Sequence, residues 1–199
     1  MTQPNIQALM GAGFNYKSTS FSSDAYASVK FESSGTGIQP IYGSGDPCHF
    51  AAVYSRTDPS KGAVYNKVST NNTQVPAGLD TFLTDDYILF WISAAYVTNM
   101  PQGALFNMLN ANGGGAKLHE MEILSTSFAC GTACGMVYMM ATVPGPSSHG
   151  IEKLELRRSV TGQTDPSGPV VYSNVNSPYL MLLELMWSSA GFYTPVEIT

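Results

Sequence analysis

The chain has 199 residues, of which 44% are hydrophobic and only 12% are charged, and its formal net charge at pH 7 is -5. Its lysines and arginines are scattered, so we expect no basic surface for direct nucleic-acid binding. The longest apolar runs span about nine to eleven residues, roughly half of what a membrane helix needs, and we expect no membrane insertion.

The cysteine count and the first residues bear on the compartment. The chain has 3 cysteines, an odd number that argues against a disulfide framework and favours synthesis in a reducing cytoplasm. Residues 1–20 lack the cationic start, apolar core and small-residue cleavage site of a secretory signal. We therefore expect synthesis in the cytoplasm without export.

Turn-forming segments rich in glycine, proline, asparagine and serine punctuate the chain, and the stretches between them favour strands. This pattern is typical of short antiparallel strands in a sandwich or barrel. It predicts an all-β protein with one antiparallel β-sandwich or jelly-roll-like domain over residues 28–199. Residues 1–27 are expected to form an N-terminal arm or a short helix.

The first predicted strands lie in the N-terminal half of that domain. Residues 48–55 alternate in polarity, residues 62–69 form a shorter candidate, and residues 86–97 are nearly all apolar. Because a wholly apolar strand needs cover on both faces, we expect residues 86–97 to form a central strand.

A possible reactive group stands at the start of the first of these strands. Asp46, Cys48 and His49 are close in sequence and resemble a thiolate with a neighbouring base. Adjacent side chains of a strand point to opposite faces, however, so Cys48 and His49 cannot easily share a proton. The prediction is a buried Cys48 beside a surface His49.

After the turn at residues 110–115, the sequence LHEMEI at residues 118–123 offers His119, Glu120 and Glu122 as potential ligands. In a strand, Glu120 and Glu122 would share one face. A metal site needs about three or four converging ligands, so we interpret this segment as a solvated strand face.

Residues 128–141 contain two Ala-Cys-Gly steps, FACGTACG, and two glycines disfavour a helix there. In a regular strand, Cys130 and Cys134 would lie about 13 Å apart at roughly 3.3 Å per residue. That separation exceeds the limit of about 7 Å between the Cα atoms of a disulfide. The sequence therefore predicts two separate, buried thiols.

The opposite face of the same predicted strand is formed by small residues. We expect them to lie where another layer or subunit approaches closely, and we add the two tryptophans as interface candidates. The candidate packing and interface residues are Ala129, Gly131, Ala133, Gly135, Trp91 and Trp187.

The C-terminal region predicts further strands. Residues 151–160 and 169–175 flank a turn-rich segment and are expected to form a hairpin. Residues 178–188 fit either a helix capped by Ser177 or a strand, and the apolar character of the segment all round favours a strand.

Strong catalytic signatures are missing from the sequence. It has no glycine-rich phosphate loop, no His-Glu-x-x-His and no Gly-x-Ser-x-Gly elbow. We therefore predict a protein that is not an enzyme, with no catalytic residue, no cofactor and no metal ion.

The β-rich character, the few charges and the segment IEKLELRRSVTGQTDPSGPVVYS at residues 151–173 resemble virion structural proteins of tailed phages, such as head decoration, cement or capsid-associated proteins. The resemblance implies location in the virion, self-assembly into a homo-oligomer such as a trimer, and contacts with other virion proteins. Two alternatives stay open: a carbohydrate-binding β-sandwich, such as a tail-fibre or lectin-like adhesin, and a β-rich hydrolase whose site is assembled from distant residues.

Overall fold

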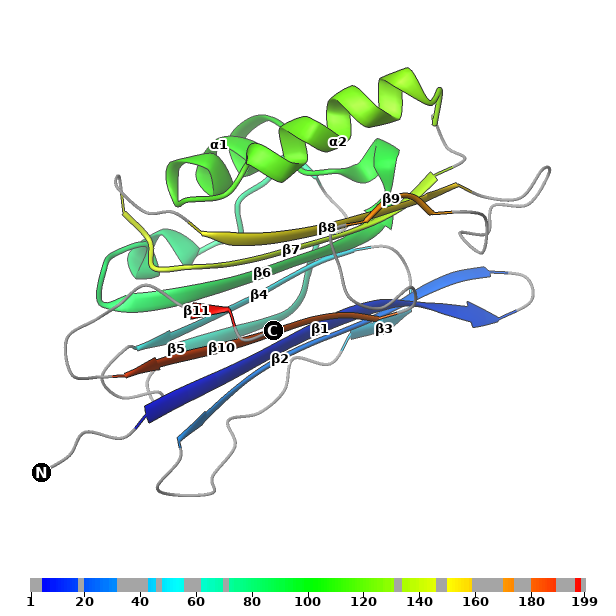
Figure 1. The fold of residues 1–199 in the computed structure, drawn as a ribbon. Helices are drawn as coiled ribbons and strands as arrows, with labels where there is room; N and C mark the ends of the chain where they lie inside the picture. The colour runs from blue at the N-terminus through cyan, green and yellow to red at the C-terminus, as the bar shows by residue number, and fades with distance from the viewer. Residues whose placement is uncertain are drawn as a thin grey trace, which may run out of the picture.

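A computed structural model of the protein describes residues 5–17, 20–31, 43–45, 48–55, 62–69, 72–130, 134–145, 150–158, 170–173, 180–188 and 196–197. Its strands form two antiparallel sheets, and two helices lie over one face of the larger sheet (Figure 1). The content is thus mixed. The expectation of a chain without major helices is wrong for the region between residues 103 and 127.

The larger sheet has six strands in the order β5-β4-β6-β7-β8-β9, with antiparallel neighbours throughout. The strands are β4 (Cys48–Ser55), β5 (Gly62–Ser69), β6 (Tyr87–Tyr96), β7 (Cys134–Thr142), β8 (Ile151–Arg158) and β9 (Val170–Ser173). The predicted strands at 48–55 and 62–69, the central strand and the C-terminal hairpin are confirmed.

Strand β6 has buried side chains on both faces of this sheet. It lies between β4 and β7, and its side chains alternate between the two faces. Leu89 and Trp91 belong to the core beneath the helices. Ile88 and Phe90 point the other way and are equally buried, on the side where the five-stranded sheet lies (Figure 1).

The second sheet has the order β11-β10-β1-β2-β3. Its strands are β1 (Asn5–Lys17), β2 (Ser20–Phe31), β3 (Gly43–Gly45), β10 (Leu180–Ser188) and β11 (Val196–Glu197). The strand preference for residues 178–188 is confirmed for Leu180–Ser188, and residues 178–179 lie outside the described part. The short helix considered for the N-terminal residues is wrong for Asn5–Lys17, because these residues form β1, an interior strand paired with both β2 and β10. The expected boundary after residue 27 falls inside β2.

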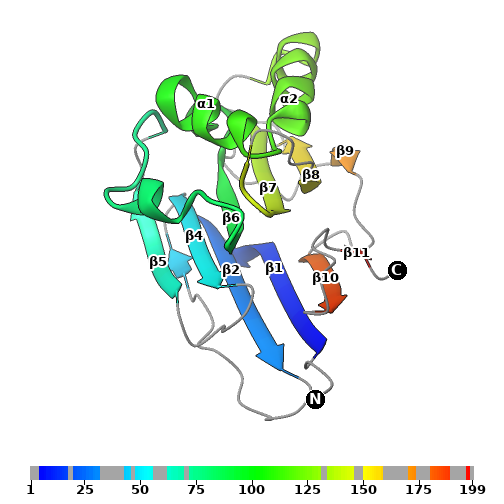
Figure 2. The same ribbon diagram turned by 90° about the vertical axis from the view of Figure 1, so that its left-hand side faces the viewer.

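Two α-helices, α1 (Gly103–Ala111) and α2 (Ala116–Ser127), connect β6 to β7 and lie on the same side of β6, β7 and β8 (Figure 2). Short 3-10 helices, η1 (Leu79–Phe82) and η2 (Val97–Asn99), flank β6. Among the described residues, no helix is both long enough and apolar enough to cross a membrane.

Helix α2 replaces the solvated strand expected at residues 118–123, which is a correction. Leu118, Met121 and Leu124 recur every three residues, so one helical face carries all three. Leu118 and Met121 are buried, and Leu124 packs against the same core. This face lies against β7 and β8, and its burial stabilises the helix. In a strand, Met121 would point to the opposite face from Leu118 and Leu124.

Three glycines make the sharp turn from α1 into α2. Gly113 and Gly115 have φ of 93° and 92°, in the left-handed region that glycine tolerates best. Position 114 requires glycine because β7 side chains lie very close to its backbone. A Cβ there would lie 2.8 Å from the Tyr138 hydroxyl and would also meet the Met140 sulfur. The turn therefore lays the start of α2 directly onto β7.

Candidate functional site

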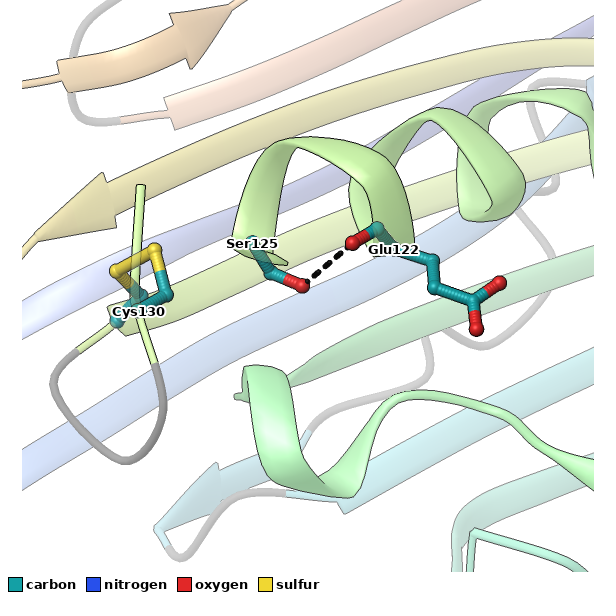
Figure 3. The surroundings of a disulfide bond; sticks show 4 residues. Glu122, Ser125 and Cys130 are labelled. Atoms are coloured by element: carbon teal, nitrogen blue, oxygen red, sulfur yellow. Dashed lines mark hydrogen bonds between the residues drawn. A yellow bond between two sulfur atoms is a disulfide. The ribbon is translucent and has the colours of Figure 1, made fainter. Parts of the chain in front are cut away.

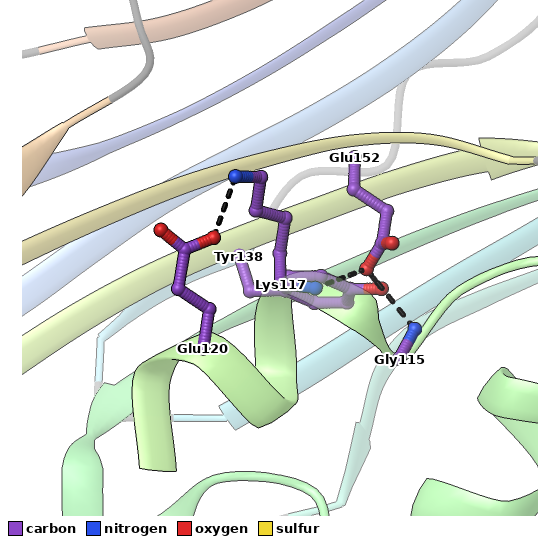
Figure 4. Close-up of polar contacts among 5 residues, drawn as sticks. All are labelled: Gly115, Lys117, Glu120, Tyr138 and Glu152. Atoms are coloured by element: carbon purple, nitrogen blue, oxygen red, sulfur yellow. Dashed lines mark hydrogen bonds and ion pairs between the residues drawn. The ribbon is translucent and has the colours of Figure 1, made fainter. Parts of the chain in front are cut away.

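The start of α2 is capped by a carboxylate from a neighbouring strand (Figure 4). The N-cap residue is Gly115, which has no side chain to accept from the helix. The Glu152 carboxylate of β8 takes this role, accepting from the Gly115 N-H at 3.0 Å and the Lys117 N-H at 3.3 Å. A negative charge at a helix N-terminus also interacts favourably with the helix dipole.

Tyr138 completes this arrangement from β7. Its hydroxyl donates to the same Glu152 oxygen at 2.8 Å. Burial raises the pKa of Tyr138 well above its ordinary value, and the nearby Glu152 charge raises it further. The phenol therefore remains protonated as a donor, and the contact serves to hold α2 on the sheet.

The end of α2 is closed by a Schellman motif. The Cys130 N-H donates to the Ser125 carbonyl at 2.9 Å and the Ala129 N-H donates to the Thr126 carbonyl at 3.1 Å, which is the hydrogen-bond pattern of that motif. Ala129 has φ of 49° and occupies the left-handed position where glycine is usual.

A disulfide between Cys130 and Cys134 fastens the same end of α2 to the first residue of β7 (Figure 3). The two Cα atoms are 5.1 Å apart. The expectation of two separate thiols in one strand is wrong. Residues 128–130 form a turn after α2 instead of extending as a strand, so the separation expected for one regular strand does not apply.

With both ends fixed, α2 presents its outer face to solvent. Ile123 and Phe128 are 55% and 45% exposed and are the large exposed hydrophobic residues among the described side chains. His119 and Glu122 lie on this helix with their side chains largely exposed, and His119 Nδ1 is 3.6 Å from Glu122 Oε2. We treat this outer face of α2, with Phe128, as the candidate functional site.

A pocket of about 240 Å³ opens beside this face, between the start of α1 and α2. Its apolar lining comes from Met100, Pro101, Phe106 and Leu118, and its polar lining includes Gln102 and Glu122. Glu122 thus belongs both to the pocket and to the outer face of α2.

A second polar group is buried in the sheet beneath the helices. Ser93 Oγ forms hydrogen bonds with His49 Nδ1 at 2.8 Å and with the Trp91 Nε1-H at 2.9 Å. The rings of His49 and Trp91 stack with centroids 5.9 Å apart. His49 is 1% exposed, so the expectation of a surface histidine is wrong, and burial lowers its pKa to about 4.

Sequence reasoning missed this group because its members come from different strands. His49 of β4 stands directly opposite Ser93 of β6 in the strand register, 44 positions away in the chain. A short sequence motif cannot predict a pair whose members are so far apart in the chain. Asp46 lies outside the described residues, as does the Cys48 side chain.

The structure describes only part of the predicted set of packing and interface residues. Gly135 is in β7, and Ala129 is exposed in the turn after α2. Trp91 is fully buried within the chain, and Trp187 stands in β10 opposite Ile6 of β1. Gly131, Ala133 and the Trp187 side chain lie outside the described part of the structure.

Among the described residues, no group of three or more histidine, cysteine, aspartate or glutamate side chains is arranged to hold a metal ion. Comparisons with models of protein families, with curated proteins and with solved structures find no match.

Proposed function

We propose that the protein is a non-catalytic structural subunit of a virion, which assembles with itself and with other virion proteins on or in a phage capsid or tail. The observation that carries this proposal is the outer face of α2. It exposes Ile123, and Phe128 is exposed at the C-cap of the same helix, which Glu152 fixes at its start and a disulfide fixes at its end.

Two physical arguments connect this face to assembly. Large apolar side chains lose contact with water when a partner covers them, which favours association. A surface that is already rigid loses little conformational entropy on binding. Ile123 and Phe128 meet both conditions, because neither end of the segment that carries them is free to fray.

We also infer that the two sheets form a β-sandwich with the helices as an additional outer layer. The burial of both faces of β6 supports this inference, since Ile88 and Phe90 need cover on the side opposite the helices. The five-stranded sheet lies on that side (Figure 1). In this arrangement the inner sheet faces are occupied within one chain, and the helix layer is left for contacts between subunits.

The location of the buried polar groups supports a non-catalytic role. Among the described residues, His49 and Ser93 place a potential base and a potential nucleophile within hydrogen-bond distance, yet both are buried, at 1% and 0% exposure. The Ser93 hydroxyl oxygen also accepts a second hydrogen bond, from the Trp91 Nε1-H. Their position in the sheet suits a structural hydrogen-bond network better than a reaction with a dissolved substrate.

Fractionation tests this proposal directly. Virus particles from the biological source of the sequence are purified by density gradient, and each fraction is searched for the protein by mass spectrometry. We expect the protein to follow the particles through the gradient at a constant ratio to the other virion proteins. Recovery only in the soluble fractions would overturn the virion assignment.

A further inference from the structure

The pocket between α1 and α2 has a preformed wall. The Asn72 side chain donates to the Met100 carbonyl at 3.1 Å, and the Gln102 N-H donates to the Asn72 carbonyl at 2.7 Å. The Met100 N-H donates to the Val97 carbonyl at 3.1 Å. These bonds fix the backbone that carries two of the lining side chains, so a ligand meets a shape that already exists.

The opposite wall belongs to α2 and is equally fixed. Leu118 is 2% exposed and anchored in the core, whereas Glu122, one turn later, reaches the pocket with a side chain that is 63% exposed. Figure 3 shows the Glu122 carboxylate extending away from the helix backbone. The carboxylate therefore stands at the rim, and the apolar residues form the interior.

The charges around the pocket favour a cation. Glu122 is the charged side chain in the lining, and its Oε2 also lies 3.6 Å from Nδ1 of the exposed His119, which is not part of the lining. Lys117, the ammonium group on the same helix, forms an ion pair with Glu120 at 2.6 Å (Figure 4). Phe106 adds an aromatic ring to the lining, and the face of such a ring also attracts cations.

We propose that this pocket binds a small organic cation, an ammonium group carried on an alkyl or aryl body. The body lies against Met100, Phe106 and Leu118, and the ammonium group pairs with the Glu122 carboxylate. Gln102 supplies an amide oxygen as a second acceptor. The proposal does not rest on the assembly role, although Glu122 lies both in the pocket lining and on the outer face of α2.

Titration of the full-length protein with benzylammonium, followed by ¹H-¹⁵N NMR, tests the proposal. Benzyl alcohol and benzoate have similar bodies and serve as neutral and anionic controls. We expect saturable shifts at the backbone amides of Gln102, Phe106 and Glu122 with benzylammonium. We also expect benzyl alcohol to bind at least about threefold more weakly and benzoate more weakly still, the range of one exposed ion pair.

Two matched variants test whether the Glu122 carboxylate is the charge that pairs with the ammonium group. Glu122→Gln keeps the size of the side chain and should weaken benzylammonium binding by about threefold to fivefold, with no effect on benzyl alcohol. Glu120→Gln removes the same charge two residues earlier, where the carboxylate pairs with Lys117, and should leave the affinity unchanged. Equal effects of the two variants, equal affinities for the alcohol and the amine, or no saturable shift at these amides would each overturn the proposal.

Discussion

Ala129 has the least favourable backbone conformation among the described non-glycine residues, with φ of 49°. A Cβ in the left-handed region costs about 1 to 2 kcal/mol, and glycine avoids this cost. Ala129→Gly should therefore raise the free energy of unfolding by about 1 kcal/mol, allowing for the extra freedom that glycine gives the unfolded chain. Urea denaturation followed by circular dichroism measures the change.

Ala104 provides the matched control, because it is an exposed alanine in the right-handed turn of α1. Glycine there should lower the free energy of unfolding by up to about 1 kcal/mol. If both glycine variants are destabilised equally, the Schellman geometry assigned to the end of α2 is contradicted.

His49 makes stability depend on pH in a defined direction. Its pKa in the folded protein is about 4, below the ordinary value of 6.5, so the unfolded chain binds the proton more readily between these values. The stability gained by keeping His49 neutral is therefore complete above pH 6.5 and is lost as the pH falls toward 4. The loss amounts to about 3 kcal/mol, at 1.36 kcal/mol per pKa unit.

The comparison with His49→Gln isolates this contribution from the carboxylates, which titrate in both proteins. Urea denaturation is measured at pH 7 and at pH 4. We expect the free energy of unfolding to fall by about 3 kcal/mol more in the wild type than in the variant. Parallel decreases would show that His49 is not the buried neutral group described above.

Glu152 accepts three hydrogen bonds at one carboxylate oxygen. Glu152→Ala leaves the buried Tyr138 hydroxyl and the Gly115 N-H without this acceptor, and such a loss costs about 1 to 3 kcal/mol. Denaturation should show a decrease in that range. Glu120→Ala removes a partly exposed ion pair with Lys117 and should change stability by about 1 kcal/mol or less. A decrease for Glu152→Ala no larger than that for Glu120→Ala would contradict the capping role.

At the scale of elements, the disulfide fixes the end of α2. It closes a loop of sequence separation 4, and the chain-entropy relation for so short a loop gives about 2 kcal/mol. We expect Cys130→Ser with Cys134→Ser to lower the free energy of unfolding by that amount. Alkylation of the denatured wild type should label one thiol per chain before reduction and three after, and three labels before reduction would contradict the pairing.

Strands and helices differed in how far the sequence predicted them. Strands β4, β5 and β6 were predictable because alternation and continuous apolar runs directly reflect which faces are covered. Helix α2 was not, because Ile123 places an apolar side chain on its exposed face and weakens the amphipathic pattern. Its cap is also remote, since Glu152 lies 37 residues after Gly115.

The error at the cysteines has a similar cause. A helix end is usually indicated by glycine, and α2 ends with Ala129 in the position that glycine normally occupies. Without that signal, the apolar alternation of β7 was extended back to residue 128. The extended spacing then excluded a disulfide that the actual turn permits.

At the scale of the whole molecule, the missed features are the ones formed between distant segments. β1 pairs with β10, so that Asn5 stands opposite Ser188, and no local pattern in the first residues reports this. The same holds for the pair of His49 and Ser93. Composition and periodicity predicted most of the strands, whereas sheet order, helix caps and buried polar pairs depend on the complete fold.

The central claim is that the outer face of α2 mediates assembly, and sedimentation equilibrium of the purified protein tests it most directly. We predict an oligomeric wild type. The double variant Ile123→Glu with Phe128→Glu should be a monomer with an unchanged circular dichroism spectrum, because both side chains are exposed. Thr84→Glu, at an exposed loop position before β6, should remain oligomeric. A wild type that stays monomeric at all concentrations, or a double variant that assembles as the wild type does, would contradict the claim.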